Sequence, residues 1–228
     1  VIFVISDCGT ITWYEPPPVM TETDNLVPSV ADSKELVSGV DGSLSWNFTL
    51  TGEQFVSAVL KWKTTTVANI RPSLGAIAVV PGFEDHFNLT WSNSQRATLV
   101  IFNVTTEHDG DISCETSSIV GGNLKIWTRK IQVAVVAPSK INYISENQTV
   151  NQNVEVYLNC TAEGLPKPNI CWSRLSDNRV VTMPLNITGR KDQGGYRCTA
   201  FNKIGDPDTA DVFITVESKS NNILITWQ

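Results

Sequence analysis

Short runs in which apolar and polar residues alternate recur along this chain from Val37 onward. Turn-forming residues separate the runs roughly every eight to twelve positions, and a period of two is typical of a half-buried β-strand. In residues 41–48 the alternation places Leu44, Trp46 and Phe48 on one face. No amphipathic helix of useful length interrupts this pattern, so the sequence predicts an all-β fold.

Similar runs predict the other strands and divide them into two sets. The short connection at 135–139 separates the sets, which favours two domains of about 100 residues each, at 35–137 and 138–217. Further strands of the first set are expected at residues 59–63, 87–90, 97–101, 109–114 and 130–136. Strands of the second set are expected at 153–160, 169–174 and 195–202, with only the short segment 180–187 before the last.

Both ends of the chain lack this regular pattern. Residues 1–34 contain three consecutive prolines and a polar stretch without a clear period, so we expect a leader or a linker there. Residues 1–5 are compatible with the tail of a secretory signal and equally with an ordinary strand. Residues 218–228 are expected to begin a further module or to form a tail. Because the chain begins with Val1 rather than methionine, we interpret it as a fragment.

The most informative motif lies in the second half. Cys160 is followed twelve positions later by Trp172, and residues 192–198 end in Tyr196, Arg197 and Cys198. This interval leaves room for a strand, a turn at 164–168 and a return on an opposite sheet. The segment resembles the I-set or C2-set immunoglobulin repeats of neural cell adhesion molecules, lachesin, hemicentin and receptor tyrosine kinase ectodomains. The resemblance implies two tandem immunoglobulin-like β-sandwiches with Greek-key topology, a disulfide between Cys160 and Cys198 with Trp172 packed on it, and a hydrogen bond from the Tyr196 hydroxyl to the backbone.

The first half resembles a V-set immunoglobulin domain with an altered core. Trp46 stands where the second strand of the family carries a cysteine, and Ile112 stands where the family has a tyrosine. Cys114 therefore has no partner in its own core. Losing the disulfide costs about 4 kcal/mol, whereas burying an indole removes about 150–250 Å² from water, which offsets the loss. We expect Trp46 to pack over Cys114 and Trp62.

Charge and glycosylation signals indicate where the chain works. The net charge is −6, and no cluster of lysine and arginine exists that could bind a nucleic acid. The longest apolar runs, residues 1–5 and 130–137, are far shorter than the roughly 20 residues that span a bilayer, so a membrane would be reached only through an anchor outside this fragment. A disulfide and a high density of Asn-x-Ser/Thr acceptors predict an extracellular or cell-surface location. The acceptors are Asn47, Asn88, Asn103, Asn147, Asn159 and Asn186.

Residues for catalysis or metal binding are not apparent. The two histidines, His86 and His108, occupy the places of a V-set arginine and aspartate that form a salt bridge, so they are interpreted either as a pH-responsive contact or as two surface residues. Cys8 and Cys171 have no zinc spacing; Cys171 is expected to face outward as a free thiol or an intermolecular link, and Cys8 to bridge to an upstream module. Without a phosphate-binding loop or paired carboxylates, we expect no enzyme activity, no cofactor, no metal and no small-molecule substrate.

The function that fits best is extracellular adhesion or recognition, with a cell-surface or matrix protein as partner. In V-set domains of the family, the face formed by strands C, F and G commonly binds the partner, and the resemblance implies the same here. On that face Lys61, Lys63, Ser113 and Glu115 are the candidate partner-binding residues, because opposite charges on neighbouring strands suit self-complementary pairing. The alternative is that they are solvated residues without a partner. Two other functions remain open: structural repeats of a matrix protein, and the ligand-binding ectodomain of a receptor whose catalytic domain lies elsewhere.

Overall fold

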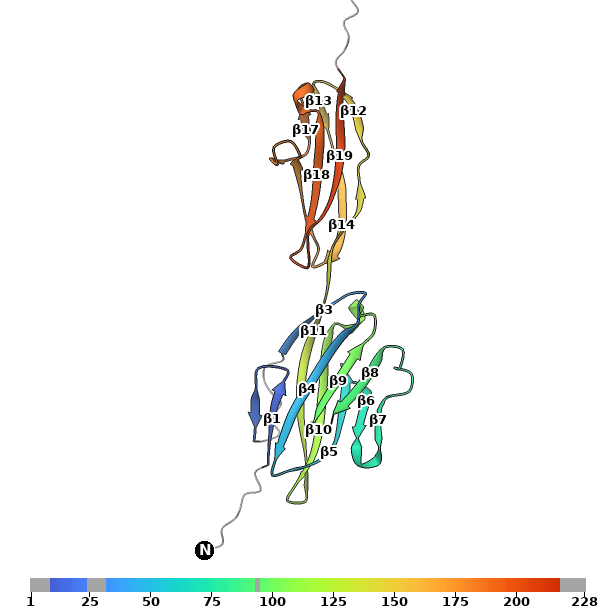
Figure 1. Cartoon of the computed structure of the whole chain (residues 1–228), viewed down its shortest axis with the longest axis vertical. Coiled ribbons are helices and arrows are strands. Elements are labelled where there is room, and N and C mark those ends of the chain that lie inside the picture. Colours follow the sequence, from blue (N-terminus) through green and yellow to red (C-terminus); the bar gives the residue numbers. More distant parts are fainter. Residues whose placement is uncertain (1–8, 24–31, 93–94, 218–228) are drawn as a thin grey trace, which may run out of the picture. The chain divides into compact units, whose positions relative to one another are not determined.

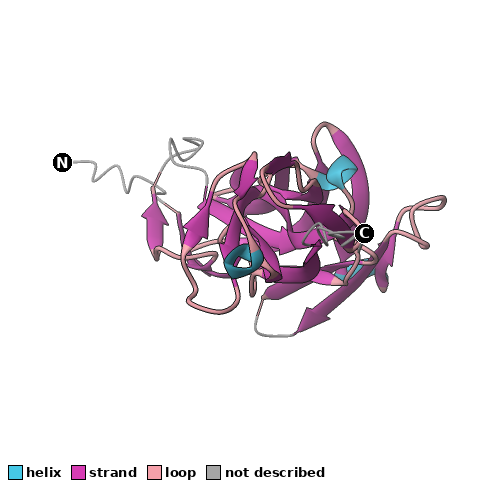
Figure 2. Cartoon of the chain, turned by 90° about the horizontal axis from the view of Figure 1, so that it is seen from above, coloured by secondary structure: helices cyan, strands magenta, loops and turns pink. Residues whose placement is uncertain are grey.

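The computed structural model describes residues 9–23, 32–92 and 95–217. The chain divides into two compact units, Val1–Val135 and Val136–Gln228 (Figure 1). Strands make up most of the described chain and its helices are short (Figure 2). The all-β immunoglobulin-like fold predicted from the sequence is therefore confirmed. Cys8 and residues 218–228, for which a bridge and a further module were expected, lie outside the described residues.

One sheet of the first unit has the strand order β2-β1-β4-β9-β8. Its central strand β4 pairs antiparallel with β1 on one side and with β9 on the other. Alternating residues of β4 and β9 are buried, as the period-two pattern predicted. The strands are β1 (Thr10–Glu15), β2 (Met20–Glu22), β4 (Gly42–Thr51), β8 (Phe87–Ser92) and β9 (Arg96–Ile101).

The facing sheet of the first unit is built on the long hairpin of β10 and β11. Within this unit the order is β11-β10-β5-β6-β7, and β3 pairs with β11 at the other edge. The extra strands β6 and β7 beyond β5 agree with a V-set arrangement. The strands are β3 (Asp32–Val37), β5 (Gln54–Trp62), β6 (Thr65–Arg71), β7 (Ala76–Val79), β10 (Gly110–Val120) and β11 (Asn123–Ile144); short 3-10 helices are η1 (Pro72–Leu74) and η2 (Thr106–His108).

The interpretation of residues 1–34 as a leader or linker is wrong for the described part of that segment. Strand β1 pairs with β4, and the side chains of Ile11 and Trp13 are fully buried in the core of the first unit. Strand β2 folds back on β1, and β3 joins the facing sheet. The prolines that follow β1 end it after six residues, which leaves too short an alternation to stand out in the sequence.

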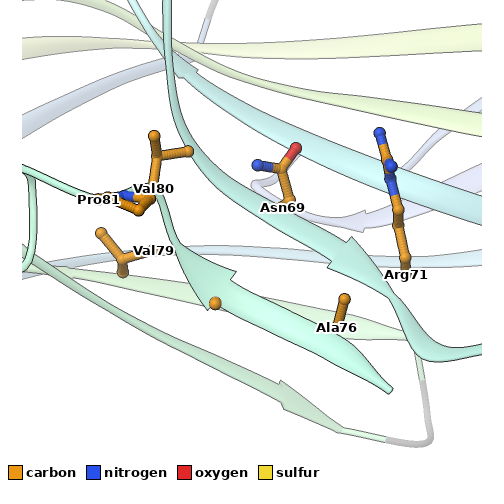
Figure 3. A pocket seen from close by; sticks show the side chains of 7 residues that line it. Asn69, Arg71, Ala76, Val79, Val80 and Pro81 are labelled. Atoms are coloured by element: carbon orange, nitrogen blue, oxygen red, sulfur yellow. The ribbon is translucent and has the colours of Figure 1, made fainter. Parts of the chain in front are cut away.

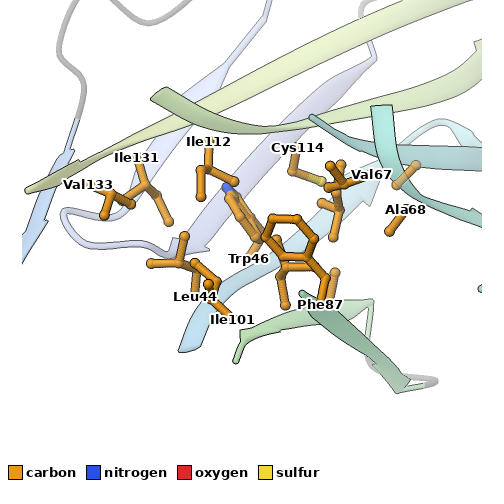
Figure 4. Packing of buried hydrophobic residues seen from close by; sticks show 14 of the residues in the cluster. Leu44, Trp46, Val67, Ala68, Phe87, Ile101, Ile112, Cys114, Ile131 and Val133 are labelled. Carbon is orange, nitrogen blue, oxygen red and sulfur yellow. The ribbon is translucent and has the colours of Figure 1, made fainter. Parts of the chain in front are cut away.

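The core of the first unit lies between its two sheets. Leu44, Trp46 and Phe48 are fully buried, as the alternation in residues 41–48 predicted. Trp46 lies at the centre of this core, with Leu44 and Ile101 on one side and Ile112 on the other (Figure 4). Trp62 is only partly buried and packs against the same cluster.

The second unit is a smaller sandwich. Strand β12 runs parallel to β19, and the order of that sheet is β12-β19-β18-β15-β16. On the other side β13 pairs with β17, and β14 pairs with the second part of β11. The strand expected at 153–160 is instead broken into β13 and β14. The elements are β12 (Gln148–Asn151), β13 (Val154–Val156), β14 (Cys160–Leu165), β15 (Asn169–Arg174), β16 (Val180–Val181), β17 (Leu185–Ile187), η3 (Arg190–Asp192), β18 (Gly194–Phe201) and β19 (Asp208–Glu217).

Candidate functional site

A disulfide joins the two sheets of the second unit. Cys160 on β14 and Cys198 on β18 are bonded across 38 positions of sequence. The ring of Trp172 lies in the same cluster, and the residue is 7% exposed. The Tyr196 hydroxyl donates a hydrogen bond to the backbone carbonyl of Asp192 at 2.8 Å. The disulfide, the tryptophan and the tyrosine therefore have the arrangement that the resemblance implied.

The carboxylate of Asp192 closes the same corner. It accepts hydrogen bonds from the backbone N–H of Thr188 at 2.8 Å and from the Thr188 hydroxyl at 2.7 Å. Burial alone would raise the pKa of Asp192, but these hydrogen bonds to the charged form outweigh burial and hold the pKa below its usual value. The turn before β18 is thus fixed by polar groups as well as by apolar packing.

Trp46 connects the two sheets of the first unit. The indole N–H of Trp46 donates to the backbone carbonyl of Arg129 across the sandwich at 3.2 Å. Cys114 is fully buried in the same cluster, and burial raises the pKa of its thiol to about 12. The thiol is therefore protonated at neutral pH and unreactive. The close ring neighbours of Trp62 are Phe87 and His108, at centroid distances of 5.8 and 5.4 Å.

A fully buried arginine, which the sequence interpretation missed, ties the N-terminal hairpin to the core. The guanidinium of Arg129 on β11 lies 2.7 Å from the carboxylate of Asp32, and its side chain is 0% exposed. The same Nη2 atom donates to the carbonyls of Pro16 and Pro18, each at 3.1 Å. Burial raises the pKa of nearby Glu22 to about 7, although the positive charge of Arg129 opposes the rise.

One interpretation of the sequence placed both histidines on the surface. The structure shows that this is wrong for His108. His86 is exposed, but His108 is 3% exposed, stacks on Trp62 and meets the edge of Phe87 at 5.9 Å. The backbone N–H of Thr105 donates to Nδ1 of His108 at 3.0 Å. Burial lowers the pKa of His108 from 6.5 and outweighs the hydrogen bond with the Thr105 backbone, which raises it. The buried ring is therefore held in its neutral form.

We expect His108 to make the first unit less stable in acid. Because the folded state binds the proton more weakly than the unfolded chain, stability is complete above pH 6.5 and falls as the pH drops through and below that value. The raised pKa of Glu22 acts in the opposite sense between pH 7 and 4.5, so total stability is a poor readout. The measurement is the difference in melting temperature between the wild type and His108→Gln from pH 7.5 to 5.

That difference should fall toward acid pH, because glutamine cannot take up a proton but can fill the same capping position. His86→Gln is the matched control at an exposed site. It should leave the pH dependence of the wild type nearly unchanged. A difference between wild type and His108→Gln that stays constant over the whole range would contradict the assignment.

The outward side chains of β11, β10, β5, β6 and β7 in the first unit form what we call the front face. Lys61 and Glu115 lie on it, but they pair with each other within one chain, with Nζ 2.7 Å from Oε1. Ser113 is also on an outward position yet is only 5% exposed. Lys63 lies in the turn after β5, where its Nζ donates to the carbonyl of Glu107 at 3.2 Å and lies 5.3 Å from the Trp62 ring centroid. Ser113 is therefore covered, and Lys63 is held at the turn after β5.

Small and uncharged residues occupy much of the front face. Strand pairing aligns Ala78, Asn69 and Val59 in one row across β7, β6 and β5. A hollow of about 330 Å³ opens at the β6–β7 edge of this row. Figure 3 shows its lining, in which short side chains of β7 lie beside the longer ones of β6. The lining residues are Asn69, Arg71, Ala76, Ala78, Val79, Val80 and Pro81.

The β10–β11 hairpin brings exposed apolar residues to the front face. Ile119 on β10 pairs with Leu124 on β11. Ile126 lies two residues further along β11 and points to the same face. Their exposed fractions are 39%, 62% and 47%. Three large aliphatic side chains that gather at one hairpin and stay exposed are a feature of surfaces that bind other proteins.

The acceptor asparagines of the first unit lie away from the front face. Asn47 on β4 and Asn88 on β8 alternate with buried residues and so point outward from the other sheet, which we call the back face. Asn103 follows β9 and is exposed. In the second unit Asn147, Asn159 and Asn186 are all exposed. Within the described part of the first unit, no acceptor asparagine is on a strand of the front face.

Other kinds of site find little support. Within residues 9–23, 32–92 and 95–217 no group of three histidine, cysteine or acidic side chains could hold a metal ion. Over the same residues, none of the helices has the length and apolar character needed to cross a bilayer. Cys171 on β15 is a half-buried free thiol, opposite Thr199.

Comparison with known proteins supports the immunoglobulin-like fold. Residues 138–202 match the family model for an immunoglobulin domain. Protein amalgam of Drosophila melanogaster is 27% identical over 205 residues, which cover 81% of this chain and 59% of that protein. Limbic system-associated membrane protein of Rattus norvegicus is 35% identical over 108 residues, which cover 41% of this chain and 32% of that protein.

A solved structure has the same fold. A chain in the crystal structure of Dpr2 Ig1-Ig2 in complex with DIP-Theta Ig1-Ig3 superposes with a TM-score of 0.53 at 17% identity, over 83% of this chain and 65% of that chain. The matched region therefore spans about 59% of Protein amalgam and a smaller part of the rat protein. The family-model match shows that residues 138–202 form an immunoglobulin domain, and the fold of both units and these relatives show that the chain is similar to multi-domain immunoglobulin adhesion proteins.

Proposed function

We propose that this chain is an extracellular recognition module that binds another immunoglobulin-superfamily protein on a cell surface through the front face of its first unit. The observation that carries the proposal is the contrast between the two faces. The back face holds Asn47 and Asn88, which are acceptors for bulky glycans, whereas the front face combines small residues, a hollow and exposed aliphatic side chains. A face without glycans is the one that a protein can approach closely.

The location follows from the chemistry of the second unit. A disulfide such as Cys160–Cys198 forms and persists in oxidising compartments, which favours secretion or exposure on the cell surface. The similarity to Limbic system-associated membrane protein supports the same location.

The class of partner is inferred from shape and from the relatives. The front face is a sheet surface with one hollow at its β6–β7 edge, and a surface of this shape complements the sheet face of another domain. In the solved complex, immunoglobulin domains of Dpr2 are bound to immunoglobulin domains of DIP-Theta. Since Lys61 and Glu115 already neutralise each other within one chain, pairing of these charges between two copies is not needed for binding. A partner of different sequence is therefore favoured over a second copy.

A glycan placed on the front face should abolish binding. Asn69 points into the hollow and is followed by Ile70 and Arg71, so Arg71→Thr creates a new acceptor with a single substitution. The expected result is a loss of at least about tenfold in affinity, or about 1.4 kcal/mol. Binding is measured with the secreted chain on cells that display single immunoglobulin-superfamily ectodomains, and self-binding is measured by bead aggregation with the same chain.

Arg71→Val is the matched control, because valine has the shape of threonine and also removes the charge but creates no acceptor. It should change binding about threefold or less, as expected for loss of one charge at the rim. Mass spectrometry establishes that Asn69 is occupied. An occupied Arg71→Thr variant that binds its partner as well as the wild type would move the site to another surface, and strong bead aggregation by the wild type would make a second copy the partner.

A further inference from the structure

An acceptor asparagine and a residue with an exposed aromatic ring are neighbours on the β12 and β19 side of the second unit. Strand β12 runs parallel to β19 with Gln148 opposite Ile214, so Asn147 and Phe213 precede this pair on adjacent strands. The backbone N–H of Phe213 donates to Oδ1 of Asn147 at 2.8 Å. This hydrogen bond holds the side-chain amide of Asn147 against the backbone of Phe213.

The ring of Phe213 is fixed on one side and open on the other. Phe213 lies directly across from Gly195 on β18, and a Cβ atom at Gly195 would come within 3.1 Å of its Cε1 atom. Because Gly195 has no side chain, the ring of Phe213 can pack against the sheet at this position. Phe213 nevertheless remains 52% exposed, which is a large apolar area for a residue in the middle of a strand.

We propose that Asn147 carries an N-linked glycan whose first N-acetylglucosamine packs on the open side of the Phe213 ring. Asn147, Gln148 and Thr149 form the acceptor sequence, and Asn147 is exposed. In the transfer, Nδ2 bonds to C1 of the sugar while the bond from C1 to a lipid-linked pyrophosphate breaks. The pyrophosphate leaves with the bonding electron pair, and the proton lost from Nδ2 passes to the solvent. Oδ1 takes no part in this change, so its hydrogen bond from Phe213 is retained.

The glycan and the ring are matched in chemistry as well as in position. One side of N-acetylglucosamine presents C–H groups, which cover an aromatic ring and remove apolar area from water. The fixed amide lowers the number of conformations that the first sugar must lose to make this contact. The inference concerns the second unit and is independent of the recognition face proposed on the first.

The test is a double-mutant cycle in the full chain, secreted from cells that glycosylate. Thr149→Val removes the acceptor and keeps a β-branched side chain, whereas Thr149→Ser keeps the acceptor. Phe213→Thr removes the ring. The melting transition of the second unit is identified by its sensitivity to reduction of the disulfide. Mass spectrometry should show Asn147 occupied in the wild type and in Thr149→Ser.

Loss of the glycan by Thr149→Val should lower that melting temperature by about 2–4 °C in the wild type and by less than about 1 °C with Phe213→Thr. Equal shifts in both backgrounds, or an unoccupied Asn147, would overturn the proposal. The same shift in protein made without glycans would assign it to the strand instead. Loss of binding to a second copy or to a partner chain by Phe213→Thr would show that a protein, rather than a sugar, covers the ring.

Discussion

Trp46→Ala is expected to destabilise the first unit by about 4–5 kcal/mol, whereas Cys114→Ala should cost about 1 kcal/mol. Trp46 is one of the largest fully buried side chains, and its removal leaves a cavity between the two sheets. The backbone carbonyl of Arg129 also loses the hydrogen bond from the indole. Cys114 is buried as well, but its loss removes a single sulfur atom, so the order of the two effects is the informative result.

Urea denaturation of the full chain, followed for the unit that is insensitive to reduction of the disulfide, measures this order. Trp46→Phe is the matched control, since it keeps an aromatic ring but has no N–H group. It should fall between the two alanine variants, at about 2 kcal/mol. If Cys114→Ala proved the more destabilising substitution, the view that the indole substitutes for the disulfide would be wrong.

Much of the fold could be predicted because most strands carry a clear period of two. Residues 43–48 and 87–90 alternate regularly, and both lie in strands of the structure. Strand β1 was missed because only Ile11 and Trp13 mark its inner face before the prolines begin. The break between β13 and β14 was missed because the burial of Val156 and Leu158 continues the alternation through residues that are not in a strand.

The candidate site was harder to predict because it depends on which residues meet across strands. Their positions in the V-set pattern identified Lys61 and Glu115 as candidate partner-binding residues. Only the structure shows that they pair with each other and that Ser113 is covered. The stacking of His108 on Trp62 likewise depends on packing from separate strands. The hollow arises from alanines on β7, which have no sequence signal of their own.

Arg129 is the residue at which the prediction from the sequence and the structure differ most. It occupies an inward position between Trp127 and Ile131 on β11, all three of which are buried. A charged residue in an inward row is usually taken as the end of a strand. Here it marks a buried ion pair, and the alternation on both sides was the signal that could have revealed it.

Arg129→Met should destabilise the first unit by about 3–5 kcal/mol, because it leaves the Asp32 carboxylate and two proline carbonyls without their donor. Arg129→Lys should cost about 2 kcal/mol, since an ammonium group keeps the charge but stands on a shorter side chain than the guanidinium, whose Nη2 atom reaches all three acceptors. Urea denaturation measures both, and hydrogen exchange should show β1 and β2 losing protection before β4.

The double substitution Asp32→Leu with Arg129→Met separates a buried charge from a simple loss of packing. Replacing both partners of a buried ion pair by apolar residues is often nearly neutral, whereas removing one partner leaves an uncompensated charge. The double variant should therefore be more stable than Arg129→Met alone by about 2 kcal/mol. The double variant could instead lose as much stability as the two single variants together. Arg129 would then act through its volume and its proline contacts, and Asp32 would contribute nothing to holding β1, β2 and β3 against the sandwich.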